Sequence, residues 1–134
     1  SLFDRILVDA PCTCEGTSRK TNQPILAVDE TFRNSIVQIQ KALLRRAIKL
    51  CRPGGVILYA TCTYAPEENE GVLSSVSESD VIIEPMELPH GWHFAQPVTS
   101  WHGENYRPDV VNGCRIWPHQ NDTGGFFIAR LRRL

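Results

Sequence analysis

The stretch VILYATCTYAPEENE, residues 56–70, joins a strand pattern, a cysteine and a helix start. Its first five residues are apolar and rich in β-formers, as in a strand that is buried on both faces of a sheet. Cys62 follows at the carboxyl end of this strand. Pro66 and the glutamates after it predict a helix over residues 66–77, in which the acids complement the helix dipole. Chemistry in open α/β sheets is found at the carboxyl ends of the strands, so Cys62 is a candidate nucleophile.

A second segment in which a cysteine follows a predicted strand lies near the start of the chain. Residues 3–8 predict a strand buried on both faces, and the loop 9–17 that follows it carries Cys12. A helix is predicted over residues 29–50, with Asp29 as its N-cap. Strand, helix and strand in this order imply a parallel crossover, which would bring Cys12 and Cys62 to one edge of the sheet.

The predicted long helix has one apolar face, and the glycines after it are expected to end the helix. Gly54 and Gly55 offer the left-handed conformation that ends many helices. Residues that recur at spacings of three and four should face the sheet. They are Phe32, Ile36, Ile39, Leu43, Ala47 and Leu50.

The second half of the chain predicts further strands around an irregular segment. A strand is expected within residues 80–86, and residues 88–112 lack any period and predict a variable surface loop or insertion. A short strand over 114–119 and a last strand over 126–131 fit an antiparallel pair added to a parallel sheet. The predicted fold class is therefore α/β, in one domain.

The composition describes an ordinary globular chain. Of the 134 residues, 42% are hydrophobic and 22% charged. The net charge of −1 gives no global signal for nucleic-acid binding, although a basic stripe could exist locally. No apolar run approaches the roughly 20 residues of a membrane span. The odd number of cysteines, five, suits a reducing compartment, so we expect a cytoplasmic protein.

Most of the remaining cysteines and histidines have unremarkable interpretations. Cys51 and Cys114 are expected to be small core residues. Cys12 and Cys14 could form a metal or redox pair, but no second ligand pair has zinc spacing, and we expect no metal. The histidines are expected to be surface or structural residues: His90, His93, His102 and His119.

Three motifs together carry a resemblance to a known family. They are Asp-Ala-Pro-Cys at 9–12, Thr-Cys at 61–62 with the following Pro-Glu-Glu-Asn-Glu, and the strand motif of 115–119 and 123–127. Their order and spacing resemble the Nol/Nop/Sun RNA (cytosine-C5) methyltransferases, which use S-adenosylmethionine. The resemblance implies a Rossmann-like class I methyltransferase fold. Residues 1–134 would be the C-terminal half of its catalytic domain, with the N-terminal half and most of the cofactor site absent.

The resemblance also implies roles for individual residues. Cys62 would add to C6 of a cytosine as a thiolate, and Cys12 would assist product release. Asp9 would lie between the base and the cofactor. The chain reads Pro-Cys-Thr-Cys-Glu-Gly where the commoner family motif is Pro-Cys-Ser-Gly-Glu-Gly, so Cys14 is an additional thiol. A thiolate suits reversible addition to a soft electrophile. A following helix N-terminus should favour that thiolate to some extent, although the nearby glutamates oppose it.

The substrate implied by the resemblance is RNA, with ribosomal RNA expected first and transfer RNA second. The residues expected to contact it are Asp9, Pro11, Arg19 and Lys20. We expect the chain alone to bind S-adenosylmethionine weakly and to be inactive. One alternative is a non-catalytic fragment that binds RNA or pairs with another subunit. Another is a DNA cytosine methyltransferase, in which Cys12 would be the nucleophile and Cys62 would be unexplained.

Overall fold

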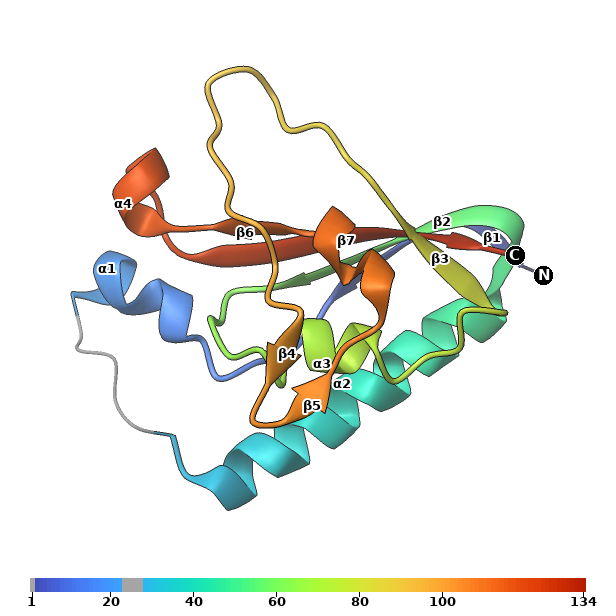
Figure 1. Ribbon diagram of the computed structural model, residues 1–134, viewed down its shortest axis with the longest axis horizontal. Coiled ribbons are helices and arrows are strands. Elements are labelled where there is room, and N and C mark those ends of the chain that lie inside the picture. Colours follow the sequence, from blue (N-terminus) through green and yellow to red (C-terminus); the bar gives the residue numbers. More distant parts are fainter. Residues whose placement is uncertain (1, 23–27) are drawn as a thin grey trace.

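The structure is a computed structural model that describes residues 2–22 and 28–134, without the side chains of Arg19 and Lys20. A mixed sheet forms one layer, and the long helix α2 runs along one of its faces (Figure 1). The elements are β1 (Phe3–Asp9), η1 (Glu15–Thr17), α1 (Ser18–Thr21), α2 (Glu30–Leu50), β2 (Cys51–Thr61), α3 (Glu70–Leu73), β3 (Val81–Glu84), β4 (Ser100–Trp101), β5 (Glu104–Asn105), η2 (Pro108–Asn112), β6 (Cys114–Ile116), α4 (Pro118–Asn121) and β7 (Phe126–Arg133).

The predicted strand–helix–strand unit is present. β1 and β2 are parallel neighbours, with Val8 beside Tyr59 and Asp9 beside Ala60, and α2 connects them. Asp29 caps α2 as expected, because its side chain accepts a hydrogen bond from the backbone of Thr31. The carboxyl ends of both strands therefore lie at the same edge of the sheet.

β7 organises the other half of the sheet. The strand order is β1-β2-β7-β3, and β7 is antiparallel to β2 and to β3. β6 also pairs with β7 in antiparallel register, which confirms the predicted pair of late strands. The core lies between this sheet and α2, and Cys51 and Cys114 are buried in it as expected.

The apolar face predicted for α2 is largely wrong. Of the six predicted residues only Ala47 is buried, whereas Phe32, Ile39 and Leu43 are 53%, 49% and 40% exposed. The face that packs on the sheet consists of Val37, Gln40, Leu44, Ala47 and Ile48. The helix carries two apolar stripes, and its buried stripe includes a polar residue, Gln40, that a hydrophobicity pattern omits.

The prediction that β1 is buried on both faces is also wrong. Phe3 is 53% and Leu7 is 65% exposed, whereas Val8 is buried. Alternate side chains of a strand point to opposite faces, and β1 lies at the edge of the sheet with α2 on one side only. The apolar residues on the other face of β1 consequently remain accessible in the described part of the structure.

Two predictions for the ends of helices need correction. Gly54 has a φ of 78° but lies inside β2, where the pairing with β1 shifts register; α2 passes directly into the strand at Cys51. The helix predicted over 66–77 is reduced to α3, since residues 66–69 form turns in which the Pro66 carbonyl accepts from the backbone of Asn69 and Gly71. Pro66 is therefore not at the first position of a helix.

Residues 88–112 are only partly the surface loop that was predicted. Tyr106, Arg107 and Val110 are buried. The Arg107 guanidinium donates to the carbonyls of Val76 and Val81 at 3.1 and 2.8 Å and pairs with Asp109. Burial alone would raise the pKa of Asp109, but hydrogen bonds from Arg107 and from a backbone amide lower it. These contacts anchor the end of the segment to the core, while His90, His93 and His102 are exposed as predicted.

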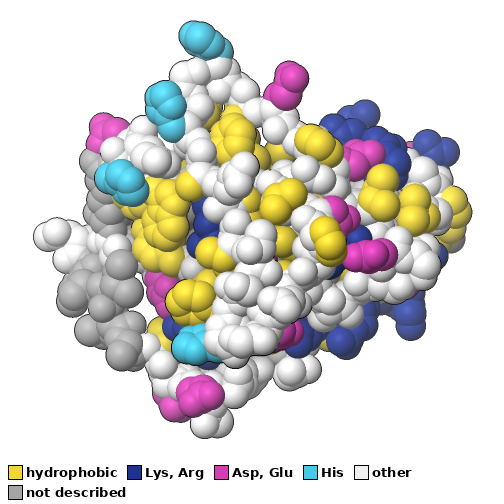
Figure 2. Space-filling model, in the orientation of Figure 1, with side chains coloured by type: hydrophobic (Ala, Val, Ile, Leu, Met, Phe, Trp, Pro, Cys, Tyr) yellow, Lys and Arg dark blue, Asp and Glu magenta, His cyan; other side chains and the backbone are white. Residues whose placement is uncertain are grey.

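The basic side chains gather at the end of the molecule where both termini lie (Figures 1 and 2). Several of them have acidic partners: Arg130 and Arg132 both pair with Glu84, and Arg133 pairs with Asp80. The hydrogen bond from Arg132 lowers the pKa of Glu84. None of the helices among the described residues has the length and apolarity needed to cross a membrane.

Candidate active site

The two predicted active-site thiols lie next to each other. The Sγ atoms of Cys12 and Cys62 are 3.2 Å apart, although fifty residues separate them in the sequence. Each follows the carboxyl end of its strand, β1 or β2. The Cys62 carbonyl accepts a hydrogen bond of 2.7 Å from the backbone of Gly16, which ties the two loops together. The parallel crossover therefore creates the thiol pair.

The electrostatic environment keeps both thiols neutral at rest. Burial raises the pKa of Cys62, and the hydrogen bond with Cys12 raises it further. Burial is also the main cause of the raised pKa of Cys12. The expectation that a helix N-terminus favours a Cys62 thiolate is wrong, because α3 has a single turn and begins only at Glu70. To become a nucleophilic thiolate, Cys62 therefore has to lose a proton that its surroundings hold tightly.

The raised pKa predicts slow alkylation of Cys62 at neutral pH. Only the thiolate is nucleophilic, so the rate with iodoacetamide should rise about tenfold per pH unit, from pH 7 to above the usual cysteine pKa. Peptide mapping by mass spectrometry would assign the reaction to Cys62, and the Cys62→Ala protein is the control. A rate that is already constant above pH 7 would contradict a raised pKa.

A pocket of about 340 Å³ opens beside Cys62. This volume lies at the lower end of the range for small-molecule sites and has room for a single base. Apolar side chains are exposed on the surface near α4 and β6 in Figure 2, and Trp92 and Phe126 are 43% and 37% exposed. The residues that line the pocket are Gly16, Thr17, Cys62, Trp92, Ile116, Thr123, Gly124, Gly125 and Phe126.

Two glycines shape the wall of this pocket. A Cβ atom on Gly16 would lie 2.4 Å from the Gly125 carbonyl oxygen and 2.6 Å from that of Cys62. The backbone of Gly125 donates to Gly16 at 2.8 Å. Tyr64 packs against Gly125 and stacks on Trp117, with ring centroids 4.8 Å apart. Only glycine permits this close approach of three backbone segments around Cys62.

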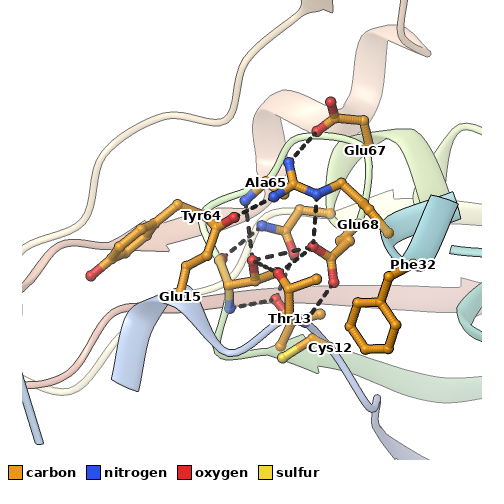
Figure 3. A network of polar contacts seen from close by, with 12 residues as sticks. Cys12, Thr13, Glu15, Phe32, Tyr64, Ala65, Glu67 and Glu68 are labelled. Atoms are coloured by element: carbon orange, nitrogen blue, oxygen red, sulfur yellow. Dashed lines mark hydrogen bonds and ion pairs between the residues drawn. The ribbon is translucent and has the colours of Figure 1, made fainter. Parts of the chain in front are cut away.

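A buried carboxylate, Glu68, holds the two cysteine loops together (Figure 3). It accepts from the backbone and hydroxyl of Thr13 at 2.9 and 2.7 Å. It also accepts from Thr63 at 3.3 Å and from Gln40 of α2 at 3.1 Å. The sequence suggested that Glu68 is a helix-start charge, which is wrong, because its carboxylate points into the fold. Its hydrogen bonds fix the neighbours of Cys12 and Cys62 relative to each other.

Arg33 and Glu15 add a charged contact on the outer side of this network. The Arg33 guanidinium donates to Glu15 at 2.6 Å and lies 3.9 Å from Glu68. This pair links α2 to η1, directly after Cys14. Sequence reasoning assigned no role to either residue: Glu15 belongs to the Pro-Cys-Thr-Cys-Glu-Gly motif but was not singled out, and Arg33 lies outside the motifs.

A second buried ion pair supports the far side of the site. Arg115 of β6 donates to both carboxylate oxygens of Glu70 at 2.7 Å, and its third nitrogen donates to the Tyr64 carbonyl at 2.9 Å. The guanidinium also lies 5.8 Å from the ring centres of Trp117 and Phe127. Glu70 is fully buried, so its interpretation as a helix-start charge is incomplete. The pair joins two of the three sequence motifs.

The structure says less about the roles of the remaining predicted site residues. Asp9 is exposed at the end of β1, beside Ala60 of β2. Pro11 is exposed, and its carbonyl accepts from Gln40 at 2.8 Å. Arg19 and Lys20 lie in α1, but their side chains are outside the described part of the structure. Neither Asp9 nor Pro11 lines the pocket beside Cys62.

Two relatives with similar sequences carry the names of RNA methyltransferases. The chain is 37% identical to the tRNA (cytosine(49)-C(5))-methyltransferase of Pyrococcus abyssi, covering 98% of this chain and 42% of the relative. It is 34% identical to the ribosomal RNA small subunit methyltransferase F of Aeromonas salmonicida, covering 98% of this chain and 26% of that protein. The chain thus spans less than half the length of these relatives.

Solved structures and a family model agree with the sequence relatives. A methyltransferase homologue from Pyrococcus horikoshii superposes with a TM-score of 0.79 at 33% identity, over 99% of this chain and 40% of its own. NSun6 from the same organism, crystallised with SFG, superposes with a TM-score of 0.72 at 31% identity, over 95% of this chain and 29% of its own. The family model of the 16S rRNA methyltransferase RsmB/F matches residues 1–132. The chain therefore belongs to the RsmB/F family of RNA (cytosine-C5) methyltransferases.

Proposed function

We propose that this chain carries the nucleophile of an RNA cytosine-C5 methyltransferase that forms 5-methylcytidine. The observation that carries the proposal is the pair of Sγ atoms 3.2 Å apart, at the carboxyl ends of two parallel strands, with Cys62 opening into the apolar pocket. A cytosine could enter this pocket only after it has left its stack. Exposed Trp92 and Phe126 offer surfaces on which the extruded base can be held.

In the proposed reaction, Cys62 loses its proton and its sulfur bonds to C6 of the cytosine. The electron pair of the C5–C6 double bond becomes available at C5, which takes the methyl group. Loss of the C5 proton then restores the double bond and breaks the bond between C6 and sulfur. Covalent addition divides a difficult substitution into easier steps. Because the resting thiol is neutral, the rate of the first step depends on a proton acceptor near Cys62.

The thiol of Cys12 lies directly beside the Cys62 sulfur. We assign to Cys12 a part in the release step: the C5 proton passes to water, the C5–C6 double bond re-forms, and the Cys12 thiol donates a hydrogen bond to the departing Cys62 thiolate. Its Sγ is within hydrogen-bond distance of the Cys62 Sγ, and either atom can be the donor. Glu68 and Thr13 hold the loop that carries Cys12, so they are positioning residues for this step.

The methyl donor of this family is S-adenosylmethionine, which supplies an electrophilic methyl group when bound. Asp9 fits a place beside that cofactor, because its carboxylate is exposed at the carboxyl end of β1, on the edge that carries both thiols. Pro11, Arg19 and Lys20 follow it on the same connection and are our candidates for contacts with the RNA. Catalytic thiols need reducing conditions, which supports a cytoplasmic location.

Radiolabelled methyl transfer by the full-length protein would test the proposal. Ribosomal and transfer RNA transcripts should be offered separately, because relatives of both specificities are similar to this chain. Label should appear in RNA as 5-methylcytidine, and bisulfite sequencing would locate it. Cytosine-containing DNA of the same sequence is the control. Methylation of the DNA alone, or RNA binding without any methylation, would overturn the proposal.

A further inference from the structure

A third thiol lies beside the two active-site cysteines. The Cys14 Sγ is 3.8 Å from the Cys12 Sγ, and the sulfurs of Cys12, Cys14 and Cys62 all lie within 4.8 Å of one another. The proposed methyl transfer uses only two of these sulfurs. The sequence predicted that Cys12 and Cys62 share one edge of the sheet, but the spacing of the cysteines did not show that the Cys14 sulfur lies beside both of them, because Cys62 follows a different strand, β2.

The backbone at Cys14 is held in an unusual conformation. Its φ and ψ are 59° and 27°, in the left-handed region that favours glycine. A side chain is disfavoured in this region, and residues held there gather at functional positions. Cys14 is also exposed, so its thiol gains little from packing in the core. A thiol at this position is therefore not explained by stability.

We propose that Cys12, Cys14 and Cys62 form a binding site for a thiophilic divalent ion of the zinc type. Zinc–thiolate bonds of about 2.3 Å in a tetrahedral arrangement place sulfurs about 3.8 Å apart, a value within the range of the separations observed here. Solvent at the exposed side of Cys14 can supply the fourth ligand. On binding, each thiol releases its proton to water and donates a sulfur electron pair, and nothing is oxidised.

Binding of the ion would have a consequence for the proposed reaction. The ion would occupy the electron pair with which Cys62 attacks cytosine, so the metal-loaded protein would be unable to form the RNA adduct. This consequence rests on the proposed function, whereas binding of the ion rests on the sulfur positions alone. Zinc would thus act as a reversible inhibitor, and a chelator would restore activity.

Titration of the reduced full-length protein with Cd²⁺, under anaerobic conditions and without RNA, tests the site. The thiolate-to-metal charge-transfer absorption should saturate at one equivalent, and it should also develop when Cd²⁺ is added to protein preloaded with Zn²⁺, because thiolates bind the softer Cd²⁺ more tightly. The Cys14→Gly protein should bind at least about tenfold more weakly, since it loses one of three ligands. Glycine suits the left-handed backbone, so this variant should fold normally, as circular dichroism would verify.

Cys114→Ala is the matched control, because Cys114 is a buried thiol outside the cluster, and its removal should leave Cd²⁺ binding unchanged. The proposal is overturned if Cys14→Gly binds Cd²⁺ as tightly as the unaltered protein, or if no absorption saturates at one equivalent. These readouts involve no RNA. Metal binding without methyl transfer would therefore leave this inference standing and count only against the proposed function.

Discussion

Cys62→Ala is expected to abolish methyl transfer to RNA in the full-length protein, whereas Cys12→Ala is expected to accumulate a covalent RNA–protein complex. Without the Cys62 sulfur no bond to C6 can form, and loss of a covalent nucleophile typically lowers turnover by about 10⁴–10⁶. Without Cys12 the bond still forms, but release is slow. Labelled RNA that migrates with the protein on a denaturing gel would reveal the complex.

The double variant distinguishes a true adduct from nonspecific trapping. Cys12→Ala combined with Cys62→Ala should lose the complex, because the trapped bond is to the Cys62 sulfur. Cys114→Ala, which removes a buried thiol elsewhere in the sheet, should behave like the unaltered protein. Accumulation of the complex in Cys62→Ala, and not in Cys12→Ala, would require the two roles to be exchanged.

Breaking the buried pair of Arg115 and Glu70 is expected to have the largest effect on stability. Glu70→Ala should lower the free energy of unfolding by about 3–5 kcal/mol, because it leaves the guanidinium charge buried without its partner. The side chains of Glu70 and Arg115 are 0% and 6% exposed, so water cannot replace the lost bonds. Urea denaturation of the full-length protein, followed by fluorescence, would measure the change.

Two further variants check the reason for this loss. Glu84→Ala removes a carboxylate that pairs with the partly exposed Arg132, and should cost only about 0–1 kcal/mol. Glu70→Leu combined with Arg115→Met removes both charges and should recover part of the stability lost in Glu70→Ala. A loss below about 1 kcal/mol in Glu70→Ala would mean that the pair does not hold β6 to the Cys62 loop.

Local patterns predicted the elements that surround the site. The apolar run before Cys62, the run before Cys12 and the helix between them were sufficient for a parallel crossover, and that crossover alone places two thiols at one edge. The faces of these elements were predicted less well. Phe32 and Leu7 are apolar yet exposed, because burial depends on which neighbour covers a face, and a single chain pattern does not specify that neighbour.

The sequence by itself determined the order of strands and helices around Cys62 and the motifs that identify its family. Only the tertiary structure decided that Glu68 and Glu70 turn inward, that Arg115 pairs with Glu70, and that Cys14 completes a group of three sulfurs. Strand and helix patterns arise from neighbours within a few residues, whereas these contacts join segments up to about fifty residues apart. Their energies depend on burial, which exists only once the chain has folded.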